Sequence, residues 1–342
     1  MKIPRSELKA WARKNLKGIE NTLFPSFSPD LTELDEEGIR WDVQQTIKHG
    51  FVSTLCAAST LNFQEAKRFI GIVADEAGDK LLVAVSASWD NFAQNIEFIK
   101  HAEKVGCDSV LISYPNNFYP KTADEVYQVT KQMCDAADLA MVVYPSHKFN
   151  LEKLHGSGFP LDLLERMTDI DNVVAMKLGI LEPGFIYEGF RRCGDKVLVQ
   201  CPWDRWLPIL VTQYGQQWMG AGAYEMFQSP EKPYLVQCFN LMLEGKMDEA
   251  MEIFWKLTPV RLVFERQFMP TQQLGFYNSN QQKYYQWLVG GNGGFVRQTS
   301  MKLYQHDMED CKRALRAIGI TPREPDEEFY VGRMNYARMN KG

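Results

Sequence analysis

The stretch Asp171-Asn-Val-Val-Ala-Met-Lys177-Leu-Gly179 places a lysine at the end of a short run of small and branched apolar residues. A continuous apolar run of this length is typical of a parallel strand that is buried on both faces. A second run, Leu139-Ala-Met-Val-Val-Tyr144-Pro145, ends in the same way with a tyrosine. The pattern predicts two buried strands, each with a chemically active side chain at its carboxyl end.

Working outward from this stretch, short apolar runs alternate with amphipathic segments along most of the chain. The expected strands span residues 19–27, 51–56, 80–86, 109–114, 139–144, 172–177, 196–201 and 217–223. The expected helices span residues 35–49, 63–77, 91–105, 122–137, 160–167, 184–192 and 205–213, with another after Ser229. An open doubly wound sheet would need a glycine-rich turn after the first strand, where Pro25-Ser-Phe-Ser-Pro29 stands. Eight strand–helix units therefore predict an α/β fold of the (β/α)8 TIM-barrel type.

Residues at both ends of the chain lie outside this period. Residues 1–17 predict an N-terminal helical extension with one helix at 7–16, and residues 18–240 predict the barrel. Residues 241–342 predict a C-terminal helical extension with helical spacing at 247–264, 280–288 and 307–318.

Composition narrows the class of protein. The net charge is −5 with dispersed basic residues, which gives no footprint for a nucleic-acid partner. No apolar run is long enough to span a membrane, and the N-terminus lacks the apolar segment of a secretory signal. Seven cysteines without a CxxC pair indicate reduced, buried thiols. We expect a cytoplasmic protein that binds a small molecule.

The chemistry of such a barrel is expected at the carboxyl ends of its strands. A lysine held in an apolar pocket loses affinity for its proton, which is what an amine needs to attack a ketone near neutral pH. Lys177 is therefore the candidate nucleophile, and Tyr144 the candidate general acid and base. A metal site would need a cluster of histidines and carboxylates, and only His147 of the five histidines lies near a strand end. We expect no metal and no cofactor.

Other strand ends supply candidates for binding the substrate. Hydroxyl and backbone N–H groups after the second strand can hold a carboxylate, and glycines at the eighth strand leave room for a ligand. His147 and its neighbour Lys148 are also candidates for a carboxylate, or are solvated loop residues. The substrate-binding candidates are Ser53, Leu55, Phe118, Tyr119, His147, Gly179, Trp203, Gly220 and Gly222.

Several motifs, in order and spacing, carry a resemblance to a known family. They are Gly18-Ile-Glu-Asn-Thr-Leu-Phe-Pro-Ser-Phe, Leu34-Asp-Glu-Glu-Gly-Ile, Thr60-Leu-Asn-Phe-Gln-Glu, Tyr144, Lys177, Gly220-Ala-Gly222, Leu243-Glu-Gly-Lys-Met-Asp-Glu-Ala and Gly290-Gly-Asn-Gly-Gly-Phe-Val-Arg297. From about residue 18 to 320 the chain resembles the dihydrodipicolinate synthase / N-acetylneuraminate lyase family of class I aldolases. The resemblance implies Lys177 as the Schiff-base lysine, Tyr144 as the proton-transfer tyrosine, and a homo-oligomer, tetramer or dimer. It also implies a keto acid, usually pyruvate, and an aldehyde as the small-molecule partners.

The chain departs from the family pattern in three places. Where the family has Gly-Thr-Thr-Gly-Glu, this chain has Ser53-Thr-Leu-Cys-Ala57, which keeps Thr54 as a possible proton relay to Tyr144. The tyrosine pair of a synthase becomes Asn117-Phe-Tyr119, so that Phe118 or Tyr119 takes that position. The arginine that a synthase uses for its second substrate is replaced by Ser146-His-Lys148. These departures argue against dihydrodipicolinate synthase itself.

Three functions remain open from the sequence. Aromatic residues in the loops, and the pair Leu178-Gly179, resemble the hydratase-aldolase branch, which cleaves aryl-substituted unsaturated keto acids. The leading hypothesis is thus a Schiff-base lyase acting on pyruvate or on such an aryl keto acid. The alternatives are a sugar-acid-type dehydratase that uses the same lysine, and a non-catalytic ligand-binding member whose carboxylate-binding loop has changed.

Overall fold

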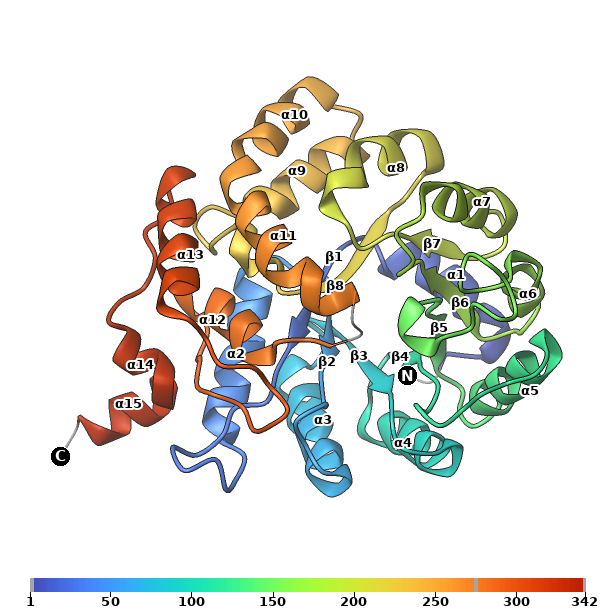
Figure 1. The fold of residues 1–342 in the computed structure, drawn as a ribbon, viewed down its shortest axis with the longest axis horizontal. Helices are drawn as coiled ribbons and strands as arrows, with labels where there is room; N and C mark the ends of the chain where they lie inside the picture. Colours follow the sequence, from blue (N-terminus) through green and yellow to red (C-terminus); the bar gives the residue numbers. More distant parts are fainter. Residues whose placement is uncertain (1–2, 274–275, 341–342) are drawn as a thin grey trace. The chain divides into compact units, whose positions relative to one another are not determined.

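The computed structural model describes residues 3–273 and 276–340 and has the (β/α)8 barrel that the sequence predicts (Figure 1). Its strands form one sheet in the order β7-β6-β5-β4-β3-β2-β1-β8. Their bounds are β1 Gly18–Leu23, β2 Ser53–Cys56, β3 Leu82–Ala87, β4 Ser109–Ile112, β5 Ala140–Val143, β6 Val173–Lys177, β7 Leu198–Gln200 and β8 Trp218–Gly222. Each strand lies within one or a few residues of the expected range, and a helical extension follows the barrel.

The chain divides into two compact units, which we describe separately. Unit 1 comprises Met1–Glu20 and Leu82–Gly220, and unit 2 comprises Asn21–Leu81 and Ala221–Gly342. The boundaries that the sequence predicts at residues 17 and 240 remain predictions.

Unit 1 contains the middle strands of the barrel with their helices. The helices are η1 Arg5–Glu7, α1 Leu8–Asn15, α4 Phe92–Val105, α5 Ala123–Cys134, η2 His147–Phe149, α6 Leu161–Met167, α7 Pro183–Cys193, η3 Asp204–Trp206 and α8 Leu207–Tyr214. Strands β3 to β7 pair in parallel, and Lys177 of β6 is opposite Gln200 of β7. Figure 1 shows α4 to α7 following one another along the outside of these strands.

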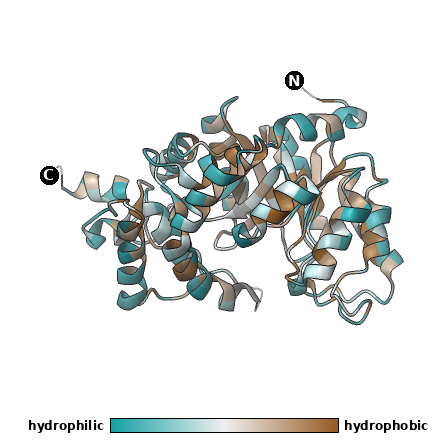
Figure 2. Ribbon diagram, turned by 90° about the horizontal axis from the view of Figure 1, so that it is seen from above, coloured by the Kyte–Doolittle hydropathy of each residue, from teal (hydrophilic) through white to brown (hydrophobic). Residues whose placement is uncertain are grey.

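Helix α4 illustrates how sequence produces these elements. Its buried residues Asn95, Phe98, Ile99 and Ala102 follow the i, i+3, i+4, i+7 spacing that places side chains on one helix face. The Asn91 side chain accepts a hydrogen bond from the backbone of the first turn, and Gly106 ends the helix in the left-handed conformation. The mixture of hydrophilic and hydrophobic residues along the helices is visible in Figure 2.

Unit 2 contains two early helices of the barrel and the helical extension. The helices of this unit are α2 Glu36–Lys48, α3 Phe63–Ala77, η4 Tyr224–Phe227, α9 Tyr234–Leu243, α10 Met247–Lys256, α11 Thr258–Gln273, α12 Ser279–Leu288, α13 Gln305–Ala317, α14 Asp326–Val331 and α15 Arg333–Met339. The single helix expected at 247–264 is wrong, because the helix ends at Lys256 and α11 begins at Thr258. Pro259 lies in the first turn of α11, where its missing N–H costs no helical hydrogen bond, so it is compatible with a new helix that begins at Thr258.

Two further observations concern the whole described chain. All seven cysteines are free and buried, as the cysteine pattern predicts. Within residues 3–273 and 276–340, no helix combines the length and apolar character needed to cross a membrane.

Candidate active site

Lys177 is the last residue of β6, a strand whose five residues are all buried. Lys177 is only 6% exposed, whereas the lysines of folded proteins are almost always in contact with water. Burial lowers the pKa of Lys177 to about 8, against the opposing charges of Glu20 and Cys201. An amine with this pKa is unprotonated in about a tenth of molecules at pH 7, roughly 200 to 300 times the fraction for an ordinary lysine.

Tyr144 follows β5 directly and is buried beside Lys177. The Lys177 Nζ lies 5.3 Å from the centroid of the Tyr144 ring. Gly179, two residues after the lysine, makes this placement of the ring possible. A Cβ atom at position 179 would lie 2.5 Å from Cε2 of Tyr144, closer than real contacts allow, and 3.1 Å from its hydroxyl oxygen. The structure thus brings together three residues that the sequence predicts for the site.

A second amine lies near the same tyrosine. Lys148, in η2, is half-buried, and its Nζ lies 5.0 Å from the Tyr144 ring centroid and 5.0 Å from that of Phe149. Burial, together with the charge of Lys177, lowers the pKa of Lys148 to about 8. By contrast, His147 is exposed, with Nδ1 3.5 Å from Glu152. Of the two loop candidates, Lys148 is the one beside Tyr144.

Aromatic rings continue outward from Tyr144. The Phe149 ring centroid is 6.0 Å from that of Tyr144 and 5.0 Å from that of Tyr114. Phe118 stands 5.8 Å from Tyr114, whereas Tyr119 is 66% exposed. The rings of Tyr144, Phe149, Tyr114 and Phe118 form a series that we call the aromatic wall. A cavity of about 220 Å³ adjoins it, lined by Ser88, Trp89, Asp90, Tyr114, Asn116 and Asn117.

Sequence reasoning missed one carboxylate at this site. Glu20 of β1 is buried and its charge raises the proton affinity of Lys177. A Cβ atom at Gly220 would lie 2.5 Å from Glu20 Oε1, so the glycine leaves space for this side chain. Gln200 of β7 also reaches the Gly220 carbonyl through its amide, within hydrogen-bond distance. The signal that could have revealed it is a glutamate within Gly18–Leu23, a strand that is buried along its whole length.

For the remaining predicted residues the structure shows burial and few contacts. Trp203 is buried after β7. In unit 2, Ser53, Thr54 and Leu55 are buried in β2, and Thr54 Oγ1 has no hydrogen-bond partner among the described residues. Gly222 in β8 adjoins the Tyr224 ring. Their roles in catalysis or binding remain predictions.

Within unit 1 the arrangement can perform amine chemistry. An amine of lowered pKa, a phenol and a second amine are grouped next to apolar rings, which is suited to attack on a carbonyl that carries a neighbouring carboxylate. In the part of the chain that the structure describes, no cluster of three or more His, Cys, Asp or Glu side chains could hold a metal ion.

Comparisons with known proteins identify the family and the fold. The chain matches the model of the dihydrodipicolinate synthetase family over residues 15–271. It is 26% identical over 235 residues to a 4-hydroxy-tetrahydrodipicolinate synthase from Syntrophobacter fumaroxidans, covering 67% of this chain and 76% of that protein. N-acetylneuraminate lyase from Fusobacterium nucleatum has a TM-score of 0.72 at 19% identity, covering 89% of this chain and 99% of that chain. The structure of PhdJ bound to a substrate intermediate has a TM-score of 0.73 at 14% identity, covering 93% and 97%.

Proposed function

Because the chain belongs to the dihydrodipicolinate synthetase family and is a lyase of the class I aldolase type, we propose that it forms a Schiff base with a 2-keto acid through Lys177. The observation that carries this proposal is the burial of Lys177, with a pKa lowered to about 8, beside Tyr144. Burial makes the neutral, nucleophilic amine available near physiological pH.

The proposed reaction begins when Lys177 Nζ attacks the C2 carbonyl and forms a C–N bond. The carbonyl oxygen takes one proton from the attacking amine and a second from Tyr144 and leaves as water, which gives an iminium between Lys177 and the substrate. The C4 hydroxyl of the substrate then gives up its proton, the C3–C4 bond breaks, and its electron pair moves into the iminium, which yields an enamine and an aldehyde; addition is the reverse. Tyr144 is the group that transfers protons in these steps, with Thr54 as its relay.

The substrate carboxylate needs a counter-charge in this apolar surrounding. Lys148 is better placed for this role than His147, because Lys148 is half-buried near the Tyr144 ring. Backbone N–H groups of Ser53 and Leu55 are the predicted second source of hydrogen bonds.

The aromatic wall supports a substrate with an aryl group over a polyhydroxylated one. Phe149 and Phe118 are half-buried rings that would supply apolar area to an aryl group. The polar groups that a sugar acid would require line the adjoining cavity and not the wall itself. We therefore place aryl-substituted unsaturated keto acids first among the substrates, with hydration of the double bond before carbon–carbon cleavage. Trp203, Gly220 and Gly222 are proposed as the other parts of this binding surface.

Borohydride trapping tests the proposal directly. The protein is incubated with pyruvate, or with an aryl-substituted unsaturated keto acid, reduced, and read by intact mass and tryptic mapping. Reduction of the imine on Lys177 prevents trypsin from cleaving after this residue. Residues 167–177 and 178–191 then appear as one peptide that carries the added mass. A sugar-acid substrate in a parallel reaction separates the lyase from the dehydratase.

Lys148 provides the internal control, since its pKa is lowered as well. An adduct at Lys148 instead joins residues 132–148 and 149–153, so the two sites are distinguished in one map. An adduct at Lys177 that Lys177→Met abolishes supports the proposal. No adduct with any of these keto acids would leave the non-catalytic ligand-binding alternative.

A further inference from the structure

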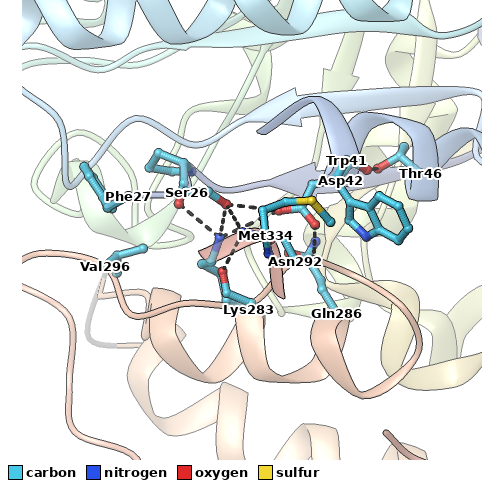
Figure 3. Close-up of polar contacts among 12 residues, drawn as sticks. Ser26, Phe27, Trp41, Asp42, Thr46, Lys283, Gln286, Asn292, Val296 and Met334 are labelled. Carbon is cyan, nitrogen blue, oxygen red and sulfur yellow. Dashed lines mark hydrogen bonds and ion pairs between the residues drawn. The ribbon is translucent and has the colours of Figure 1, made fainter. Parts of the chain in front are cut away.

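Unit 2 contains a buried polar cluster that the proposed reaction does not use (Figure 3). Lys283 of α12 is 1% exposed and donates hydrogen bonds to the Pro25 carbonyl and Ser26 Oγ, each at 3.0 Å. Its Nζ lies 3.8 Å from Asp42 Oδ2. Asp42 Oδ1 accepts a hydrogen bond of 2.6 Å from the backbone of Asn292. Lys283 and Asp42 thus form one buried ion pair.

A second carboxylate of the same unit is incompletely satisfied. Glu225, in η4, is 4% exposed, and its Oε1 accepts hydrogen bonds from Asn21 at 2.6 Å and from Gln286 at 3.0 Å. Its Oε2 is buried and has no hydrogen-bond partner among the described residues. A buried oxygen without a partner costs free energy, and a buried charge costs more. A water molecule or an ion beside Oε2 would therefore stabilise the folded state.

The two carboxylates border the same small cavity. Its lining is Asp42, Gln45, Thr46, His49, Glu225, Gln286 and Gly291, and its volume is about 10 Å³. This is roughly the space that one water molecule occupies. The cavity therefore admits a single small occupant, bordered by carboxylate, amide, hydroxyl and backbone oxygens.

Charge counting identifies the kind of occupant. At pH 8 Glu225 is ionised, and Asp42 and Lys283 together carry no net charge whichever of the two holds the proton, so the cluster carries one net negative charge. His49 adds no positive charge, because burial lowers its pKa to about 4. The neighbouring Asp35 is balanced by Arg338, whose Nη2 lies 2.7 Å from its Oδ1. One positive charge balances this cluster, whereas a divalent ion would overcompensate it.

We propose that this cavity is a binding site for a monovalent cation of about the size of sodium, held by the carboxylates of Glu225 and Asp42 with amide oxygens of Gln45 and Gln286. Hard cations prefer such oxygen ligands. The ion links η4, which follows β8, to α2 and α12, so that its binding stabilises this part of the fold.

The test compares cations at constant ionic strength. Thermal unfolding is recorded at pH 8 in sodium, potassium or choline chloride, because choline is too large for the cavity. Sodium is expected to raise the Tm of the wild type saturably, by roughly 3 to 6 °C at a hundredfold excess over Kd. Glu225→Gln, which keeps the hydrogen-bonding groups and removes the charge, is expected to lose this response. The matched control Glu252→Gln, at an exposed glutamate of the same unit, keeps it.

Sodium-23 relaxation gives a second reading that does not depend on unfolding. The wild type is expected to broaden the sodium signal beyond the Glu225→Gln variant, and excess choline to leave this broadening unchanged. If sodium and choline give the same Tm in the wild type, or if Glu225→Gln keeps the sodium response, the proposal is wrong. The cavity then holds only water, or Glu225 is kept neutral by its own proton.

Discussion

At the scale of the residue, the site contains a side chain that the sequence indicates and another that it does not. Lys177 could be predicted because a lysine at the end of an apolar strand is chemically informative by itself. Glu20 could not be assigned, since nothing in Gly18–Leu23 says which buried carboxylate lies near which amine. Lys148 was only one of two adjacent loop candidates, because the chain conformation of η2 decides which side chain is exposed.

The two amines should influence each other's protonation. The charge of Lys177 lowers the pKa of Lys148, and the interaction acts equally in the other direction. Lys148→Met removes the charge and retains an apolar side chain, so the pKa of Lys177 should rise. We expect the rate of borohydride trapping to require a pH higher by roughly half to one unit. Lys153→Met, at an exposed lysine of the same loop, should leave the profile unchanged; an unchanged profile in Lys148→Met would contradict the coupling.

At the scale of the element, local signals predict some helices and miss others. The expected helix at 63–77 agrees with α3 because Asn62 and Glu65 form a capping box at its start. Helices α14 and α15 are short and have no long apolar period. Asn335, which donates a hydrogen bond to the carbonyl of Phe27, shows that α15 is fixed by a contact distant in sequence. Such contacts are not visible in a local pattern.

The cap of α3 yields a stability prediction. The Asn62 side chain accepts hydrogen bonds from the backbone of Gln64 at 3.0 Å and of Glu65 at 2.9 Å. Asn62→Ala should reduce the free energy of unfolding by about 1 kcal/mol, because two N–H groups of the first turn lose their acceptor. Urea denaturation measures the change, with Asn62→Asp as the variant that keeps the acceptor. Equal stability of the alanine and aspartate variants would show that the cap contributes little.

At the scale of the whole molecule, the apolar runs predict buried strands but not the charges that the core contains. Asp42, Glu225 and Lys283 come from three distant parts of the sequence, and only the folded chain groups them. Strand number, order and the barrel itself follow from a repeated apolar pattern. The buried cluster has no such repeat, so it could not be predicted.

This cluster should make stability depend on pH. Burial raises the pKa of Glu225 from 4.5 to about 7, so in that interval the folded state holds a proton that the unfolded state releases. With choline as the only added cation, we therefore expect the free energy of unfolding of the wild type to fall relative to that of Glu225→Gln as the pH rises from about 4.5 to 7. The expected fall is about 3 kcal/mol. Burial lowers the pKa of His49 from 6.5 to about 4, so His49 makes the folded state more stable as the pH rises through this interval. This contribution is the same in the wild type and in Glu225→Gln.

The difference between the two proteins isolates Glu225, because Asp42, Lys283 and His49 titrate in both. Urea denaturation at several pH values measures this difference. A difference that stays constant from pH 4 to 8 would mean that Glu225 has the same pKa in the folded and unfolded states.

The contact between Gly179 and Tyr144 also limits how this site can change over evolution. A lineage that acquires any side chain at position 179 loses the space for a phenol ring at 144, and a lineage that loses the ring frees position 179 to vary. The two positions are therefore expected to covary among relatives. A glycine two residues after the lysine then serves as a sequence marker for descendants that have kept the tyrosine and the chemistry proposed for it.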